Sequence, residues 1–310
     1  MKIPFAMMFP GQGSQKIGIT NNISQNYYLI KKIFDQASNA IGYDLWNIMK
    51  YGKTKNLHNT IHTQLILLTS SVALFYLWKE QGGENPSILV GHSLGEYSAL
   101  VCADSLSLKD AVCLVKIRGQ LMKKAMLNKP EGGMIIVRGL NNDRILKICQ
   151  SSSQEDSSIV EPVILNCPKE IVIAGNKTAL LRVEKNCKMS GAGVVSLPID
   201  IPCHCKLMKP VAKEFTDLLN KVHLRPPRLP VLNNVYVKCE NNPSKIRTAL
   251  VRQLYMPFDW IKCIKFIIHK GIVIFIEVGA GHVLSRITKN ISSSLTTISV
   301  ENSDLFKQKL

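Results

Sequence analysis

A serine between two glycines is the feature of this 310-residue sequence with the clearest chemical meaning. Residues 91–95 are Gly-His-Ser-Leu-Gly, which matches the G-x-S-x-G pattern of serine nucleophiles. The apolar run Ile88–Val90 predicts a short strand before the pattern, and Glu96–Val101 predicts a helix after it. Strand, tight turn and helix hold such a serine at the tip of the turn, ready to attack a carbonyl carbon. A glycine turn without chemistry has the same pattern, but this context favours Ser93 as a nucleophile.

A serine nucleophile needs a base within hydrogen-bonding distance, and His204 is the best candidate among the seven histidines. It follows the strand predicted at Val194–Ile199, where a new helix begins, and a helix amino end favours a neutral imidazole. Its place after the serine also agrees with the chain order of α/β-hydrolase sites. A histidine that only caps the helix is the alternative. We expect His92 to point away from Ser93. Asp200 is too near His204 in the chain to be assigned as the orienting acid, so a main-chain carbonyl could hold the imidazole instead.

Backbone N–H groups that stabilise an oxyanion are expected at two places. The Leu94 amide, directly after the serine, is the first by the geometry of such a turn. The second is the glycine-rich turn 10–15, which follows the first predicted strand. This turn has Lys16 where a dinucleotide fingerprint needs its third glycine, and it lacks the Gly-Lys-Ser/Thr of a phosphate loop. We therefore interpret it as a donor of backbone N–H groups.

Arg118 interrupts the apolar stripe of the helix predicted from Leu108 to Leu127. An arginine can snorkel from the edge of a core face, and on spacing alone this explanation is as good as a functional one. A buried arginine, however, needs a partner, and a planar guanidinium suits a carboxylate that it can bind with two hydrogen bonds. Because this helix follows the serine motif closely, Arg118 indicates a substrate with a free acid group.

The composition is that of a globular protein, with 46% hydrophobic and 20% charged residues. The first residues lack a signal-peptide cleavage pattern, and no run approaches the roughly 18 apolar residues that span a bilayer, so we expect no membrane partner. Nine cysteines at irregular spacing predict unpaired thiols in a reducing cytoplasm. Cys203-His204-Cys205 could suggest a metal, but alternating neighbours cannot all face one ion, so we expect none.

The formal net charge of +17 raises nucleic acid as a partner. The lysines are scattered among asparagines and isoleucines, without a long basic run or a nucleic-acid motif, so we expect no nucleic-acid binding. Two explanations of the charge stay open. One is compositional drift, and the other is attraction to an anionic partner such as a phosphorylated cofactor or an acidic carrier protein.

Alternating strands and helices must position these residues. Apolar periodicity predicts a first strand at Ile3–Phe9 and helices at Ile30–Ile41, Thr63–Trp78 and Leu108–Leu127, the last opened by a capping box at 107–110. The helical period returns from Leu207 to Val222, and returning strands of the main sheet are predicted at Val231–Asn233 and Ile272–Phe275.

A different order of elements lies between these parts. It comprises a strand at Met134–Val137, a helix at Asp143–Gln150, strands at Val163–Asn166 and Ile171–Ala174, a helix at Thr178–Ser190 and a strand at Val194–Ile199. This βαββαβ order is the ferredoxin-like arrangement. We therefore predict an α/β fold in which a hydrolase-like large domain with a parallel sheet (1–128 and 199–310) is interrupted by a small ferredoxin-like α+β domain (129–198).

Taken together, the sequence resembles the bacterial malonyl-CoA:acyl carrier protein transacylases over almost its whole length. The motifs that carry the resemblance are FPGQGSQ, TQLILLTSSVAL, GHSLGEYSALVCA, KIRGQLM, VIAG, PCHCKLM, VRQLY and EVGAGHVL. The resemblance implies Ser93 as nucleophile and His204 as base, with the oxyanion held by the N–H groups of Gln12 and Leu94. It further implies that Arg118 binds the malonyl carboxylate and that the main-chain carbonyl of Gln253 orients His204.

The resemblance also implies partners and a reaction. Malonyl-CoA is a substrate, no cofactor is needed, and the malonyl group passes through a serine ester to the phosphopantetheine thiol of acyl carrier protein for fatty acid synthesis. We expect a cytoplasmic monomer. Three positions depart from the family pattern, and they are Cys203, which is often Ser or Phe, His282, which is often Lys or Asn, and Leu65, where proline is usual. Cys203 bears on which acyl groups are accepted. A serine hydrolase such as a thioesterase is the rival enzyme, and a basic nucleic-acid-binding protein the rival outside catalysis.

Overall fold

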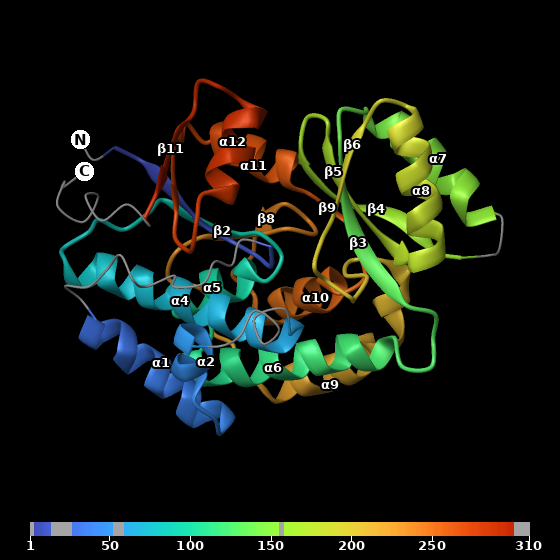
Figure 1. Ribbon diagram of the computed structural model, residues 1–310. Helices are drawn as coiled ribbons and strands as arrows, with labels where there is room; N and C mark the ends of the chain where they lie inside the picture. The colour runs from blue at the N-terminus through green and yellow to red at the C-terminus, as the bar shows by residue number, and fades with distance from the viewer. Residues whose placement is uncertain (1–2, 14–26, 52–58, 155–157, 301–310) are drawn as a thin grey trace.

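The computed structural model describes residues 3–13, 27–51, 59–154 and 158–300. These residues form two β-sheets with helices packed around them (Figure 1). The larger sheet has the order β11 (Thr296–Ser299), β10 (Ile274–Glu277), β1 (Phe5–Phe9), β2 (Ile88–Gly91), β7 (Val231–Asn233), β8 (Lys238–Cys239). The smaller sheet has the order β6 (Gly193–Ser196), β3 (Gly132–Arg138), β5 (Glu170–Asn176), β4 (Val160–Cys167), β9 (Phe258–Asp259). The predicted α/β class is confirmed.

The larger sheet is built around β1, which pairs in parallel with β10 on one side and with β2 on the other. All five residues of β1 are buried, as expected for a parallel strand that is covered on both faces. The edge strand β8 runs antiparallel to β7, so the sheet is mixed where the sequence predicted a parallel one. With only two residues, β8 gave no periodic signal in the sequence.

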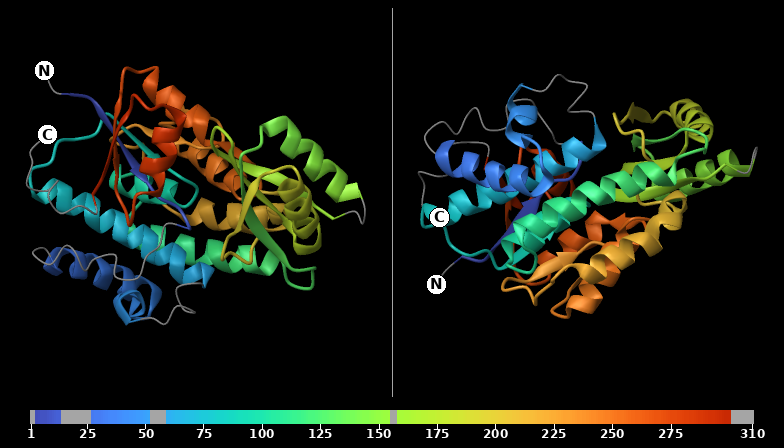
Figure 2. Two further views of the ribbon diagram at one scale, coloured as in Figure 1. Left: turned by 45° about the horizontal axis from the view of Figure 1, so that its top comes forward. Right: turned by 90° about the horizontal axis from the view of Figure 1, so that it is seen from below.

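Long helices cover the larger sheet. Helix α4 (Thr60–Glu80) packs against α1 (Tyr27–Ile41), α5 (Gly95–Cys102) and α6 (Leu108–Ala125), and α2 (Leu45–Tyr51) lies beside α1. Figure 2 shows α4 and α6 side by side along the molecule. The Ser107 hydroxyl accepts a hydrogen bond from the Asp110 amide, which caps α6 where the sequence predicted a capping box.

Helix α4 meets the length and composition of a membrane span, with a mean hydropathy of 1.4, although the sequence analysis expected no such run. The helix contains polar residues, among them Thr69, Ser70 and Ser71. In the structure 83% of the 18-residue apolar segment of this helix is buried inside the protein, and these three residues are also buried. The helix is therefore the central helix of the core.

Strands β3, β4, β5 and β6 of the smaller sheet and two helices, α7 (Asn142–Gln154) and α8 (Lys177–Met189), form the green to yellow part of Figure 1. Strand β3 lies between β5 and β6 and is antiparallel to both, and β5 is also antiparallel to β4. A hydrophobic cluster of its own fills the space under the helices. Strand β9 comes from much later in the chain and pairs in parallel with β4, so it ties this part to the rest of the molecule.

The C-terminal half of the larger part adds the short helices η2 (Lys206–Val211), α9 (Ala212–Lys221), α10 (Pro243–Gln253), α11 (Trp260–Ile268) and α12 (Val283–Ile291). The sequence predicted one helix from Leu207 to Val222, but its first turn is a 3₁₀ helix that contains Pro210. A proline inside a helix removes an N–H donor and disfavours the α conformation of the residue before it.

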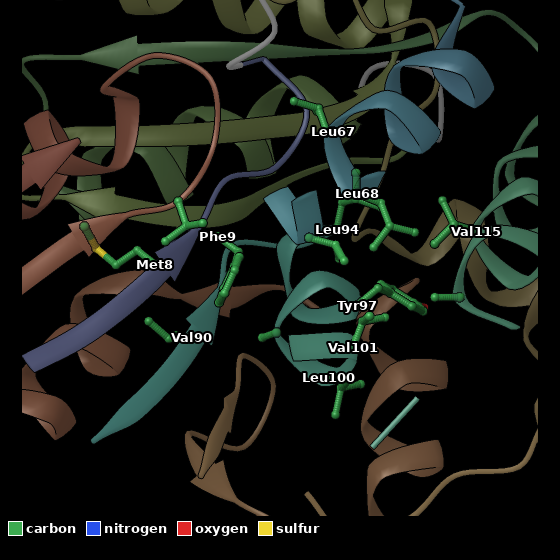
Figure 3. Packing of buried hydrophobic residues seen from close by; sticks show 14 of the residues in the cluster. Met8, Phe9, Leu67, Leu68, Val90, Leu94, Tyr97, Leu100, Val101 and Val115 are labelled. Carbon is green, nitrogen blue, oxygen red and sulfur yellow. The ribbon is translucent and has the colours of Figure 1, made fainter. Parts of the chain in front are cut away.

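The turn that carries Ser93 rests on the largest hydrophobic cluster of the protein. Figure 3 shows how side chains from five elements and from Leu94 pack together in this cluster. They are Met8 and Phe9 of β1, Val90 of β2, Leu67 and Leu68 of α4, Val115 of α6, and Leu94, Tyr97, Leu100 and Val101 in and before α5. A close-packed base of this kind allows little movement of the turn.

Candidate active site

The turn between β2 and α5 holds Ser93 in a left-handed backbone conformation, with φ of 53°. The positions of the two flanking glycines leave no room for a side chain. A Cβ atom on Gly91 would lie 1.9 Å from the carbonyl carbon of Gly95, and one on Gly95 would lie 2.0 Å from the carbonyl oxygen of Phe9. Any side chain at either position would therefore push the turn away from its packed base. This is the strand-turn-helix context that the sequence predicted.

His204 lies against the serine. Its Nε2 is 2.7 Å from Ser93 Oγ, and its Nδ1 is 2.6 Å from the main-chain oxygen of Gln253. A carbonyl oxygen only accepts hydrogen bonds, so Nδ1 carries the proton and Nε2 presents a lone pair to the serine hydroxyl. The two nitrogens thus have the roles that a general base requires.

The imidazole of His204 is held neutral by its surroundings. Burial lowers its pKa to about 3, and the positive charge of Arg118 adds to the effect, while the contact with the Gln253 carbonyl opposes it. The sequence analysis attributed the neutral ring to a helix amino end. The helix η2 begins nearby, at Lys206, and the main cause of the lowered pKa is desolvation by burial.

Arg118 projects from α6 with only 2% of its surface exposed, so it does not snorkel from the edge of the core. Its Nη1 donates a hydrogen bond of 2.7 Å to Gln64 Oε1, and its guanidinium carbon lies 5.7 Å from the ring centre of Tyr97. Among the described residues, Nε and Nη2 of Arg118 have no hydrogen-bond partner. A buried cation with two unpaired N–H donors needs an anionic acceptor.

A cavity with an empty volume of about 820 Å³ joins these groups. Ser93, His204, Arg118 and Gln64 line it, together with two further groups of residues. One group is Pro10, Gly11, Gln12, Gly13, Leu94 and Cys203, and the other is a set of apolar residues from the smaller sheet and its connections: Met134, Ile136, Ile164, Val172, Leu197 and Ile199. The cavity therefore lies where the two parts of the molecule meet, and one wall is apolar.

The glycine-rich turn after β1 reaches the site, as far as residue 13. A Cβ atom on Gly11 would lie 2.5 Å from the His92 main-chain oxygen, so this turn packs directly on the serine turn. The Gln12 side chain donates to Thr60 Oγ1 over 3.3 Å, which fixes the turn to the start of α4. Ser14, Gln15 and Lys16 lie outside the described residues.

His92 does not point away from the site as expected, because it lines the same cavity. Its Nε2 lies 3.0 Å from Asn166 Oδ1, and Asn166 Nδ2 donates to Glu170 Oε1 over 3.2 Å. Glu170 in turn pairs with Arg138 at 2.7 Å and with Arg286 at 3.0 Å. This chain of contacts crosses from the serine turn to the smaller sheet and on to α12, and sequence reasoning missed it, because its members are 4 to 116 residues apart.

The cysteines beside His204 are buried thiols. Cys203 Sγ donates to the Ile201 oxygen and Cys205 Sγ to the Pro202 oxygen. Burial raises the pKa of Cys203 to about 11 and that of Cys205 to about 12. Both are therefore uncharged near neutral pH, and the described part of the chain holds no group of three or more His, Cys, Asp or Glu residues suited to a metal ion.

Sequence comparisons identify the family of this chain. Residues 6–303 match the model of the acyl transferase domain. The chain is 46% identical over 295 residues to the malonyl CoA-acyl carrier protein transacylase of Salmonella typhimurium, with 94% of each protein covered. It is 43% identical over 302 residues to the protein of that name from Haemophilus influenzae, with 96% of this chain and 95% of the relative covered.

Solved structures agree with the sequence matches. The malonyl CoA-acyl carrier protein transacylase of Coxiella burnetii superposes with a TM-score of 0.94 at 37% identity, covering 98% of this chain and 96% of that one. A malonyl-transacylase in complex with its type II PKS acyl-carrier protein also has a TM-score of 0.94, at 41% identity over 98% of each chain. The chain therefore belongs to the acyl transferase domain family. Within that family it is a member of the malonyl CoA-acyl carrier protein transacylases, which confirms the resemblance seen in the sequence.

Proposed function

We propose that this protein transfers the malonyl group of malonyl-CoA to the phosphopantetheine thiol of acyl carrier protein, which supplies fatty acid synthesis. One observation carries the proposal: a serine and a neutral histidine 2.7 Å apart share a cavity with a buried arginine that has two unpaired N–H donors. The first pair can make and break an acyl ester, and the arginine can hold an acyl group that ends in a carboxylate.

The reaction proceeds in two half-reactions at Ser93. In the first, His204 Nε2 takes the hydroxyl proton while Oγ attacks the thioester carbon of malonyl-CoA. Backbone N–H groups of Gln12 and Leu94, which both line the cavity, stabilise the oxyanion that develops. The carbon–sulfur bond then breaks, His204 returns the proton to the sulfur of CoA, and a malonyl-serine ester remains.

The second half-reaction runs the same steps with a different thiol. His204 takes the proton of the phosphopantetheine thiol, and the sulfur attacks the ester carbon. The carbon–oxygen bond to Ser93 breaks, and the imidazolium returns the proton to Oγ. The contact between His204 Nδ1 and the Gln253 carbonyl holds the imidazole in the one orientation that both halves need.

Arg118 determines which acyl groups react. A malonyl carboxylate can accept hydrogen bonds from Nε and Nη2 of Arg118, while Nη1 of Arg118 donates to Gln64. An acetyl group offers nothing to these donors and leaves the cation unpaired in a buried site, which disfavours its binding.

We infer that the protein has two domains. Residues 129–198 form a ferredoxin-like domain, which the sheet order β6-β3-β5-β4 supports, and residues 1–128 and 199–310 form a hydrolase-like domain, which the parallel core of the larger sheet supports. The protein acts in the cytoplasm as a monomer without a metal or cofactor. An acidic carrier protein is the partner that a net charge of +17 favours.

Incubation with malonyl-CoA followed by intact-mass measurement tests the proposal. The wild-type protein gains one malonyl group, and Ser93→Ala gains none. Addition of acyl carrier protein then discharges the ester to the carrier thiol. A serine hydrolase would instead lose the malonyl group to water at the same rate with and without the carrier.

A further inference from the structure

Asn234 binds the serine turn and is not among the residues that line the cavity. It follows β7 and is fully buried. Its Oδ1 accepts a hydrogen bond of 2.9 Å from the Ser93 amide, and its Nδ2 donates one of 2.7 Å to the Gly91 oxygen. One side chain therefore binds the backbone on both sides of His92 and restrains the turn in its left-handed conformation.

Glu96, in the first turn of α5, joins Asn234 to the residue that orients the base. Its Oε2 accepts hydrogen bonds from the Asn234 amide at 3.2 Å and from Gln253 Nε2 at 2.7 Å. The same Gln253 amide group also donates to the Ser93 oxygen at 3.2 Å. Because the main-chain oxygen of Gln253 holds His204, the contacts form a closed ring through nucleophile and base.

The ring binds the backbone of Ser93 and the side chain of His204, and both residues have unusual backbone conformations. Ser93 and His204 both have positive φ, at 53° and 64°, and non-glycine residues keep such conformations only where surrounding contacts impose them. Each of the three supporting residues, Glu96, Asn234 and Gln253, has at most 2% of its surface exposed, so water cannot replace these hydrogen bonds.

The ring needs an acceptor at Glu96 more than it needs a charge. Burial raises the pKa of this carboxyl to about 7, against the hydrogen bonds from Asn234 and Gln253 and the charge of Arg118. The other titratable groups around it are Tyr97 on the same helix, Cys263 on α11, and Glu240 across a small cavity. Oε2 remains an acceptor when the other oxygen is protonated, so an amide of the same shape can replace the carboxyl.

We propose that Glu96 and Asn234 are positioning residues of the acyl-transfer reaction, which hold the serine turn and the acceptor of His204 Nδ1 in one rigid frame. They act through Ser93 and Gln253 and do not line the cavity that receives substrate. The inference rests on the proposed function, because it is measured through acylation of Ser93.

The test compares single-turnover acylation by malonyl-CoA in the wild type, Glu96→Met, Glu96→Gln and Asn234→Ala. The maximal acylation rate of Glu96→Met and of Asn234→Ala should fall by about 10- to 100-fold, because misplacement by less than 1 Å is costly for an aligned nucleophile and base. The concentration of malonyl-CoA at half-maximal rate should stay within about a factor of two, since Arg118 is untouched. Glu96→Gln should retain most of the rate.

Ile246→Ala is the matched control, because Ile246 is buried, lines the same small cavity as Glu96 and makes no contact in the ring. It should lower the thermal midpoint without a comparable loss of acylation rate. Equal losses in Ile246→Ala and Glu96→Met, or no recovery in Glu96→Gln, would overturn the inference. If Glu96→Met does not fold, Asn234→Ala decides. Failure of the wild type to become acylated would instead contradict the proposed function.

Discussion

Arg118 and Gln64 are joined by a hydrogen bond of 2.7 Å between Nη1 and Oε1 that fixes the guanidinium in the cavity wall. The bond uses one edge of the guanidinium, and Nε and Nη2 are without a partner among the described residues. Nε and Nη2 of this buried cation are therefore available to bind a ligand. This is the structural basis of the proposed preference for a dicarboxylic acyl group.

Substitution of Arg118 should change the choice of substrate. In Arg118→Ala the malonyl carboxylate is left unpaired, at a cost of roughly 3–5 kcal/mol, so kcat/KM for malonyl-CoA should fall by about 10²- to 10³-fold or more. Arg118→Lys should recover only part, because an ammonium lacks the planar fork. The slow reaction of acetyl-CoA should hold or improve. The ratio of the two substrates is the quantity to measure, and an equal decline of both would make Arg118 a structural residue.

The rates of both half-reactions should depend on His204. His204→Ala should slow acylation by malonyl-CoA and discharge to the carrier by about 10²- to 10⁴-fold each, the usual value of a general base. Because its folded pKa is lowered to about 3, the imidazole stays neutral until the pH approaches that value. The acylation rate of the wild type should therefore lack the decline near pH 6.5 that an ordinary histidine base gives. A decline there would mean that the ring is more exposed to water than in this structure.

Glu170 should stabilise the fold in a pH-dependent way. Burial alone would raise its pKa, but hydrogen bonds and charges of Arg286 and Arg138 outweigh burial and lower it. A depressed folded pKa means that the contribution is complete above about pH 4.5 and is lost as the pH falls through the folded pKa.

Glu170→Gln removes this contribution. At pH 7 it should lower the unfolding free energy by about 1–2 kcal/mol, because both arginines are partly exposed and solvent screens their charges. The difference between wild type and variant should shrink as the pH falls below about 4.5 and through the lowered folded pKa. Denaturant titrations at several pH values measure it, and a difference independent of pH would contradict the ion-pair account.

The charge of +17 should appear in the kinetics with the carrier. If an acidic carrier is steered to the enzyme, kcat/KM for acyl carrier protein should decrease as salt rises from about 0.05 to about 0.5 M. Acylation by malonyl-CoA, a smaller anion, serves as the comparison. Flat salt profiles for both substrates would indicate that the excess lysine is compositional drift.

The sequence predicted the elements with strong periodicity and the residues in recognisable motifs. The long helices around Leu67 and Arg118 and the turn at Ser93 are where the apolar pattern predicted them. The strands β8 and β9 were not predicted, because two residues are too few to show a period, and β9 also pairs with a strand that lies far away in the chain. Likewise, Glu96 and Asn234 are 138 residues apart in the chain and form their contact only after folding, so no local pattern indicates it.

The central claim is a covalent malonyl ester on Ser93. The most direct measurement is peptide mapping by mass spectrometry after brief exposure to malonyl-CoA and quenching in acid. The account predicts one added malonyl group on the peptide that contains Ser93, absent in Ser93→Ala and removed when acyl carrier protein is added. A malonyl group found on a cysteine, such as Cys203 in the cavity wall, or no acyl-enzyme at all, would contradict the account.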